Sequence, residues 1–430
     1  MVLPQQLIFN HPDHIPTHFG ALKIIGTAGE TIRQYRDIHA TIPRDNCNNQ
    51  GNVAIPSKTP VLSFSNQVKN IYQSNNFAQI KQLENMVNND LTPVYDNISL
   101  YPNSAWVKVE NNSGVQYYMS WSQNGAVYSY TQPIVPSFNM SGIIDGNAKY
   151  VATTQFGIYS NSTNIIGTHS ISLGLPQIAV RSSVALAVAQ TFGSFVRGGL
   201  GFNASQFALR LNENASKVGL GTYFKVPKYA VGQLVESLTF TIVFVGLRAL
   251  YAPEGRTRVA VFNWDNISHW QFTLQKLNGT HYPGLTDPTL LAVDTQKLSK
   301  VIPPVFNQFG DHNITASVPY TVFVYQKDPE SENSSFAIQA LRSNVSHGFT
   351  YAFDRSKGKA GQYIEGTVQL PSKFLSSVGT KWQSSPLTVA ASTGDNVPIS
   401  VTLDSSDATA PGQLLNVNIH INKATVKSCY

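Results

Sequence analysis

Residues 106–130, with the sequence WVKVENNSGVQYYMSWSQNGAVYSY, decide the class of fold. Runs at residues 106–109, 115–119 and 126–130 are rich in β-branched and aromatic side chains and repeat every two residues, which is typical of β-strands. Before the last run, Asn124-Gly125 is a dipeptide that strongly favours the turn of a β-hairpin. The stretch therefore predicts an antiparallel meander.

The second half of the chain continues this pattern of short apolar runs between Gly, Pro, Asn and Asp. We predict strands at residues 238–247, 256–264, 318–325, 336–341, 363–370, 387–390, 399–403 and 414–421. Many short strands with such turns indicate a sandwich, jelly roll or barrel. The predicted fold class is mainly β: an antiparallel sandwich or jelly-roll-like body with an extended N-terminal arm and one or a few helices.

Helical periodicity is clear in one segment only. Between residues 66 and 89, apolar side chains recur mainly at steps of three and four, which predicts an amphipathic helix packed on the main sheet; a partner-binding helix is the alternative. Residues 183–224 are ambiguous, because the Ala- and Leu-rich run at 183–195 favours a helix and nearby glycines interrupt it. A membrane-inserting segment of a pore former is a second interpretation of this stretch.

Prolines and changes of pattern predict how the chain is organised. Residues 1–60 contain proline at positions 4, 12, 16, 43, 56 and 60, which excludes a long helix and favours an extended arm that crosses the body, with an added strand as one option. We assign residues 61–255 to a β-rich shell or core domain that includes helix 66–89. Residues 256–430 form a β-rich second half, for which a separate projecting domain is one interpretation.

Charge is scarce, because only 13% of the 430 residues are charged and the net charge is +6. A surface with few charges repels other copies weakly, so self-association is eased. The densest basic stretch is Arg355, Lys357 and Lys359, followed by Lys423 and Lys427, and we interpret both groups as solvated loops or tails. Because counterion-release binding needs clustered cations, a nucleic-acid partner has little support.

Features that report on the cellular compartment point in different directions. Cys47 and Cys429 allow one disulfide at most, the N-terminus lacks the pattern of a signal peptide, and no apolar stretch is long enough to span a bilayer. Eleven N-x-S/T sequons favour secretion, although an Asn-, Ser- and Thr-rich chain also produces them by chance. They begin at Asn97, Asn111, Asn139, Asn161, Asn203, Asn214, Asn266, Asn278, Asn313, Asn333 and Asn344.

The sharpest local group of chemically active side chains is His11, Asp13, His14 and His18. Imidazole and carboxylate groups this close in sequence could bind zinc or another borderline metal. The spacing matches no strong metal motif, and the intervening prolines exclude a regular helix that would align His14 with His18. A metal site is therefore one hypothesis, and an exposed or interface histidine group is the other.

No nucleotide-binding, hydrolase or metalloprotease motif occurs in the sequence. Asp265 lies near His269 and Trp270, and Asp311 precedes His312, but closeness in sequence establishes no catalytic geometry, so we interpret them as turn or surface groups. Aromatic side chains fit β-sheet cores, with stacking on sugars as the alternative; examples are Trp121, Tyr128, Trp264, Trp270 and Trp382. We predict no enzyme activity, no catalytic residue and no cofactor.

Three hypotheses about function follow. The first is a structural, self-assembling protein, most concretely a viral capsid subunit in the virion, whose partners are copies of itself and other coat subunits. It rests on the arm, the many strands, the low charge and the absence of catalytic motifs. The second is a secreted β-rich lectin or pore-forming toxin that acts on cell surfaces, with a glycan as partner. The third is an enzyme built on the N-terminal histidines.

Overall fold

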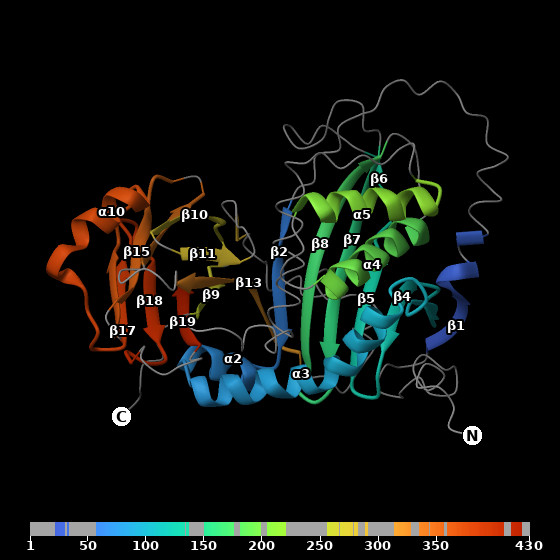
Figure 1. Cartoon of the computed structure of the whole chain (residues 1–430), viewed down its shortest axis with the longest axis horizontal. Coiled ribbons are helices and arrows are strands. Elements are labelled where there is room, and N and C mark those ends of the chain that lie inside the picture. Colours follow the sequence, from blue (N-terminus) through green and yellow to red (C-terminus); the bar gives the residue numbers. More distant parts are fainter. Residues whose placement is uncertain are drawn as a thin grey trace.

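The computed structural model describes residues 22–30, 32–33, 57–133, 135–136, 150–175, 181–198, 204–220, 256–265, 267–277, 279–282, 289–290, 314–327, 335–343, 345–356, 359–407 and 414–423. These residues form a helix-covered sheet, on the right in Figure 1, and a β-sandwich on the left. The mainly β class is confirmed, because large antiparallel sheets run through both parts.

The helix-covered part is a sheet with the order β1-β3-β4-β5-β7-β8-β2, in which all neighbours are antiparallel. Its strands are β1 (Leu22–Thr27), β2 (Ser57–Phe64), β3 (Val107–Asn111), β4 (Gln116–Trp121), β5 (Gly125–Thr131), β7 (Tyr150–Ser160) and β8 (Ile165–Leu175), and the short β6 (Val135–Pro136) pairs with β7. The predicted meander is therefore confirmed as β3, β4 and β5. Within the predicted arm, β1 forms an edge strand on β3.

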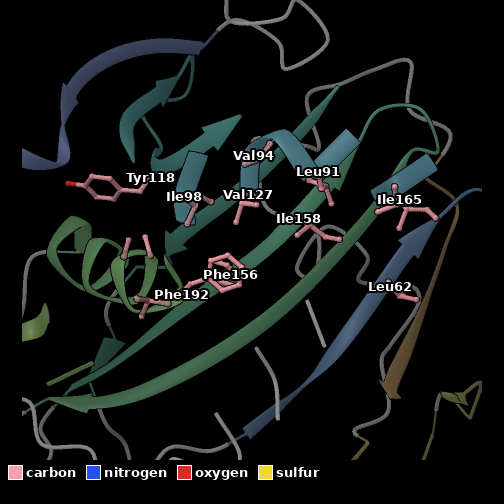
Figure 2. Packing of buried hydrophobic residues seen from close by; sticks show 14 of the residues in the cluster. Leu62, Leu91, Val94, Ile98, Tyr118, Val127, Phe156, Ile158, Ile165 and Phe192 are labelled. Atoms are coloured by element: carbon pink, nitrogen blue, oxygen red, sulfur yellow. The ribbon is translucent and has the colours of Figure 1, made fainter. Parts of the chain in front are cut away.

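Three helices cover one face of this sheet (Figure 1): α3 (Phe77–Leu100), α4 (Arg181–Gly198) and α5 (Ala204–Lys217). Figure 2 shows the core between them, where Leu91, Val94 and Ile98 of α3 point toward strand residues of β5 and β7. The ring of Phe192 on α4 lies 4.2 Å from the ring of Phe156. Burial of such apolar surface is the main source of stability in this part of the molecule.

Gly125 fits the prediction of a hairpin but also has a second role. A Cβ atom at this position would lie 2.4 Å from the backbone oxygen of Asp90 on α3. No real Cβ contact is that short, so the residue allows the β4–β5 hairpin to approach the helix closely. The Asp90 carboxylate accepts hydrogen bonds from the Ser160 and Ser162 hydroxyls, which fixes the same helix to the β7–β8 turn.

The predicted helix 66–89 is wrong in its bounds, because two helices occupy this region. The first, α2 (Asn66–Ser74), begins after Ser65, whose side chain accepts a hydrogen bond from the amide of Val68. It ends at Asn75, which adopts a left-handed conformation with φ 55°. Asn76 then caps α3 through the amide of Gln79, and α3 continues past Pro93 to Leu100 because its apolar face stays buried.

The ambiguous run at residues 183–195 is helical and lies in α4. Gly193 does not interrupt the helix; a Cβ there would lie 3.1 Å from the backbone oxygen of Pro102, so glycine permits close packing against the end of α3. Nearly every described residue of α4 from Ser182 to Gly193 is buried. Gly193 therefore reflects helix packing rather than a break, whereas α4 ends at Gly198.

The second part is a sandwich of two sheets. Its strands are β9 (Arg256–Asn263), β10 (Trp270–Leu277), β11 (Gly279–Tyr282), β12 (Thr289–Leu290), β13 (Ala316–Lys327), β14 (Ser335–Arg342), β15 (Gly348–Ser356), β16 (Lys359–Glu365), β17 (Thr388–Ser392), β18 (Pro398–Leu403) and β19 (Leu415–Ile421). One sheet has the order β13-β9-β19-β18-β17 and the other β12-β10-β14-β15-β16, with α10 (Pro371–Val378) against the second.

Most predicted strands of the second half are confirmed, but the prediction did not include β10, β11 or β12 and differs at further points. The predicted strand 363–370 ends at Glu365, and Leu370 instead precedes α10, which begins with proline. The prediction omitted β15, and Arg355 lies in that strand, where it is 4% exposed and donates to the backbone oxygen of Arg256. The interpretation of Arg355 as part of a solvated loop is therefore wrong. The predicted strand 238–247 lies outside the described residues.

The two parts are joined by β13, which pairs with β2 through residues 316–319 and with β9 through residues 320–326. One 14-stranded sheet therefore runs through both parts, so strands on either side of the predicted boundary at residue 255 belong together. The division into domains stays a prediction.

A buried ion pair crosses this junction. Arg258 on β9 donates to both carboxylate oxygens of Glu84 on α3, at 3.0 and 2.7 Å, and to the Tyr320 hydroxyl at 3.0 Å. Burial alone would lower the pKa of Arg258. The opposite charge and the hydrogen bonds of the nearby Glu84 carboxylate, together with Tyr320, have the larger combined effect, so the pKa of Arg258 is raised. The guanidinium is therefore fixed as a cation, and α3 is held to the sandwich.

The turn between α2 and α3 is also bound by the sandwich. The Asn75 side-chain amide donates to Thr402, and its oxygen accepts from Asn418 and from His420 Nε2 at 2.8 Å. His420 Nδ1 accepts from Trp264 Nε1 at 3.0 Å, which places the proton of the neutral ring on Nε2. Every polar atom of the Asn75 amide group is therefore engaged by strands β18 and β19.

Candidate binding surface

Three loops meet at one end of the sandwich. They connect β9 to β10, β14 to β15, and β17 to β18. In one sheet Trp270 at the start of β10 pairs with Arg342 at the end of β14. In the other sheet Ile421 at the end of β19 pairs with Asn263 and with Ile399, so the strand ends that carry the loops lie at the same end of the sandwich. We call this end the three-loop surface and define it by the described residues among 264–269, 342–348 and 393–397. Loops on a rigid scaffold are common carriers of binding function.

Asp265 forms the base of the first loop. Its side chain is fully buried, and one carboxylate oxygen accepts from the backbone amides of Ile267 at 3.0 Å and Ser268 at 3.3 Å. The amide of Asp265 itself donates to the Asn263 side chain. These bonds form a local turn, as the sequence interpretation of Asp265 expected, and they fix the backbone beneath Ile267.

Arg342 connects all three loops. Its Nε donates to Asp265 Oδ2 at 3.1 Å, and its Nη1 donates to Asp395 Oδ2. The second loop is further tied to the first, because the Ser343 amide donates to the His269 carbonyl and the His269 amide donates to the Ser343 hydroxyl. A planar guanidinium between two carboxylates holds the loops in one arrangement.

Asp395 organises the third loop. Burial would raise the pKa of Asp395, but hydrogen bonds from Thr393 and Arg342 outweigh it and lower that pKa, so the carboxylate stays ionised. The other oxygen of Asp395 faces His347 Nδ1 at 3.9 Å, and a Cβ at Gly394 would lie 3.0 Å from the His347 ring. The third loop therefore packs directly on the second.

Above this fixed base, the loops expose apolar side chains. Ile267 is 80% exposed and Val345 is 41% exposed, and His269 and His347 are exposed beside them. Ile267 has the largest exposed fraction among the large hydrophobic residues that the structure describes. The described loop residues combine mutual hydrogen bonds, internally paired charges and exposed aliphatic groups, which suits binding rather than catalysis.

The candidate metal ligands His11, Asp13, His14 and His18 lie outside the described residues, as do Asp311, His312, Cys47 and Cys429. Within the described ranges, no three His, Cys, Asp or Glu side chains lie close enough together to hold a metal ion. In the same ranges, no helix has the length and apolar character needed to cross a membrane. The hypothesis of an N-terminal metal site stays a prediction.

Most of the aromatic residues singled out from the sequence are core residues. Trp121, Tyr128 and Trp270 are buried, and Trp264 and Trp382 are partly buried. Asp265 and His269 were candidates from the sequence, whereas Arg342, His347 and Asp395 were not. The only local signal for these residues is that Arg342 ends an apolar strand and that His347 and Asp395 lie in polar turns between two strands.

Four sequon asparagines fall in the described ranges, and three of them are buried. Asn97, Asn111 and Asn214 are 6%, 5% and 3% exposed. The side-chain amides of Asn97 and Asn214 donate to Ser120 and Thr191, so the nitrogen that would carry a glycan is engaged inside the fold. These sequons give no support to a secretory route, and Asn161 is the described one that is partly exposed.

Comparisons with known proteins give only weak similarities. No family model matches the chain, and no curated protein matches its sequence. Among solved structures, the lipid binding protein Nakanori is 10% identical, with a TM-score of 0.27 over 51% of this chain and 88% of that one. The wild-type Xerocomus chrysenteron lectin XCL is 9% identical, with a TM-score of 0.21 over 39% and 98% of the two chains. These scores are too low to carry an argument about fold or function.

Proposed function

We propose that the protein is a non-enzymatic binding protein that attaches to cell surfaces through the three-loop surface. The observation that carries this proposal is the 80% exposure of Ile267 on a loop whose base, Asp265, is buried and fixed by Arg342. Exposing a large aliphatic side chain on a rigid loop gains nothing for folding. It becomes favourable when a partner covers it.

The test is attachment of the purified full-length protein to washed cell membranes, measured by co-sedimentation. We expect the Ile267→Ser and Val345→Ser double variant to bind markedly less than the wild type. Leu209→Ser is the matched control, because Leu209 is an aliphatic residue on α5 with 58% exposure outside the three-loop surface. Equal binding of the wild type and the double variant would contradict the proposal.

A second function, assembly into a viral shell or filament, is favoured by a different observation. Leu100 and Tyr101, at the end of α3, are 71% and 38% exposed and form an apolar pair outside the three-loop surface. Such a pair fits a contact between copies of the chain. Electron microscopy of the purified protein tests this: closed shells or regular filaments that are lost in Leu100→Ser support assembly, and a monodisperse monomer contradicts it.

A further inference from the structure

We infer that the three-loop surface binds the boundary of a lipid bilayer whose headgroups are neutral or zwitterionic, and that Ile267 and Val345 insert into it. This inference rests on the proposed function, because it names the partner of the same surface. Three observations support it: the exposed side chains are aliphatic, few charges surround them, and the apolar patch consists of the two side chains Ile267 and Val345.

The exposed side chains are aliphatic rather than aromatic. Among the described residues of the three loops, Trp264 is the one aromatic side chain other than histidine; it is partly buried, and its ring stacks on Phe262 and His420. Sugar binding in shallow sites depends on flat aromatic faces and on free polar groups. Branched aliphatic groups suit the fluid apolar layer beneath lipid headgroups, where no fixed complementary shape is required.

The charges near the patch are few and of both signs, and they include Lys69, whose ammonium lies 5.8 Å from the centre of the Trp264 ring. Asp265 and Asp395 are paired with Arg342 in the loops, and Lys423 lies just after β19 at the same end of the sandwich. Burial lowers the pKa of Lys423 from its usual range, and its side chain is only partly exposed. Anionic membranes are bound by clusters of exposed Lys and Arg, and the described loops offer no such cluster. The exposed ring of His347 can donate an N–H group to a headgroup phosphate.

Among the described residues of the three loops, the large exposed apolar side chains are Ile267 and Val345. A standard protein–protein interface buries about 800 Å² on each side around a central apolar core, which two protruding aliphatic side chains do not supply. In a bilayer each apolar group that enters the acyl boundary contributes independently of shape, so two such side chains give weak, reversible attachment.

The sequence of the loops provides an independent test, since both apolar residues lie inside sequons: Asn266-Ile267-Ser268 and Asn344-Val345-Ser346. A glycan on either asparagine would add a bulky polar group to the residue directly before Ile267 or Val345 in the sequence, which would oppose their insertion. The inference therefore requires that these two asparagines carry no glycan in the protein from its natural source, which mass spectrometry of the corresponding peptides can determine.

The main experiment is sedimentation of the full-length protein with vesicles of phosphatidylcholine alone and with vesicles that also contain phosphatidylserine. We expect binding to both. Ile267→Ser and Val345→Ser should each weaken binding by roughly tenfold, as expected for moving part of a branched aliphatic side chain out of water. Leu209→Ser should bind as the wild type does. Because the three residues are exposed, the variants should keep the circular dichroism spectrum and the urea midpoint of the wild type.

The possible outcomes separate the inference from the proposed function. Attachment to cell membranes without attachment to protein-free vesicles would overturn the bilayer as partner and leave the proposed function intact. Failure to bind either would overturn both. Binding that requires phosphatidylserine, or that falls more than about fivefold when salt is raised, would assign the contact to cations and overturn the neutral-bilayer inference. A glycan on Asn266 or Asn344 in the natural protein would also overturn it.

Discussion

The stability of the protein is expected to fall as the pH drops below about 6.5, because two histidines are buried as neutral rings. His169 on β8 and His420 on β19 are 2% and 0% exposed. Burial lowers the pKa of His169 from 6.5 to about 3. Burial, together with the nearby Lys423, lowers the pKa of His420 to about 3 as well.

The direction of this change in stability follows from the number of protons that the folded and the unfolded protein bind. Below pH 6.5 the unfolded chain binds a proton at each histidine, whereas the folded chain does not until about pH 3. The stabilisation is therefore complete above pH 6.5 and is lost progressively as the pH falls toward 3. Each histidine changes the free energy of unfolding by up to about 1.4 kcal/mol per pH unit. The two together lower the free energy of unfolding at pH 5 by roughly 4 kcal/mol relative to its value well above pH 6.5.

Urea unfolding at a series of pH values between about 7.5 and 5 measures this slope, in a range where few carboxylates titrate. His169→Leu and His420→Gln should each remove about half of the slope. His420→Gln should also lower stability at neutral pH, because the bond from Trp264 is disturbed. A wild-type protein with constant stability over this range, or two variants with the wild-type slope, would refute the reasoning.

Two further predictions concern the contacts of α3. Gly125→Ala should destabilise the fold by about 1–3 kcal/mol, because its Cβ would meet the Asp90 backbone oxygen, and the thermal midpoint measures this. Glu84→Gln should cost roughly 3–5 kcal/mol, since it leaves the Arg258 cation buried without its partner. The control Glu213→Gln, in an exposed pair with Arg210, should cost less than about 1 kcal/mol in the same urea assay; equal losses would contradict the burial argument.

Local patterns in the sequence were sufficient for the fold class and for most strands. The β3–β4–β5 meander follows from its alternation and its turns, and six of the eight strands predicted for the second half occur within two or three residues of the predicted bounds. β15 was missed although Phe349, Tyr351 and Phe353 alternate there with smaller or polar residues. The helix prediction failed at Asn75, because a single left-handed residue ends one helix and the next begins directly after it.

The candidate binding surface could not be predicted from the sequence, because its parts are far apart in the chain. Arg342 contacts Asp265 from 77 residues away and Asp395 from 53 residues away. No local pattern gives such pairings; they depend on the β10–β14 register and on the parallel pairing of β9 with β19. The exposure of Ile267 is equally hidden, since an isoleucine beside a strand is more often buried.

The Asn75 junction and the three-loop surface meet at Trp264 and Asp265, and their roles can be separated. Asn75→Gly keeps the left-handed turn but loses the three side-chain hydrogen bonds, so it should lower the free energy of unfolding by roughly 2–4 kcal/mol. Asn75→Ala should cost about 1 kcal/mol more, because a Cβ strains the turn. Both variants should bind phosphatidylcholine vesicles as the wild type does, since Asp265 is held by Asn263 and Arg342 independently of this turn. If the fully folded Asn75→Gly variant lost vesicle binding, the Asn75 turn and the three-loop surface would not be independent, and this prediction would be contradicted.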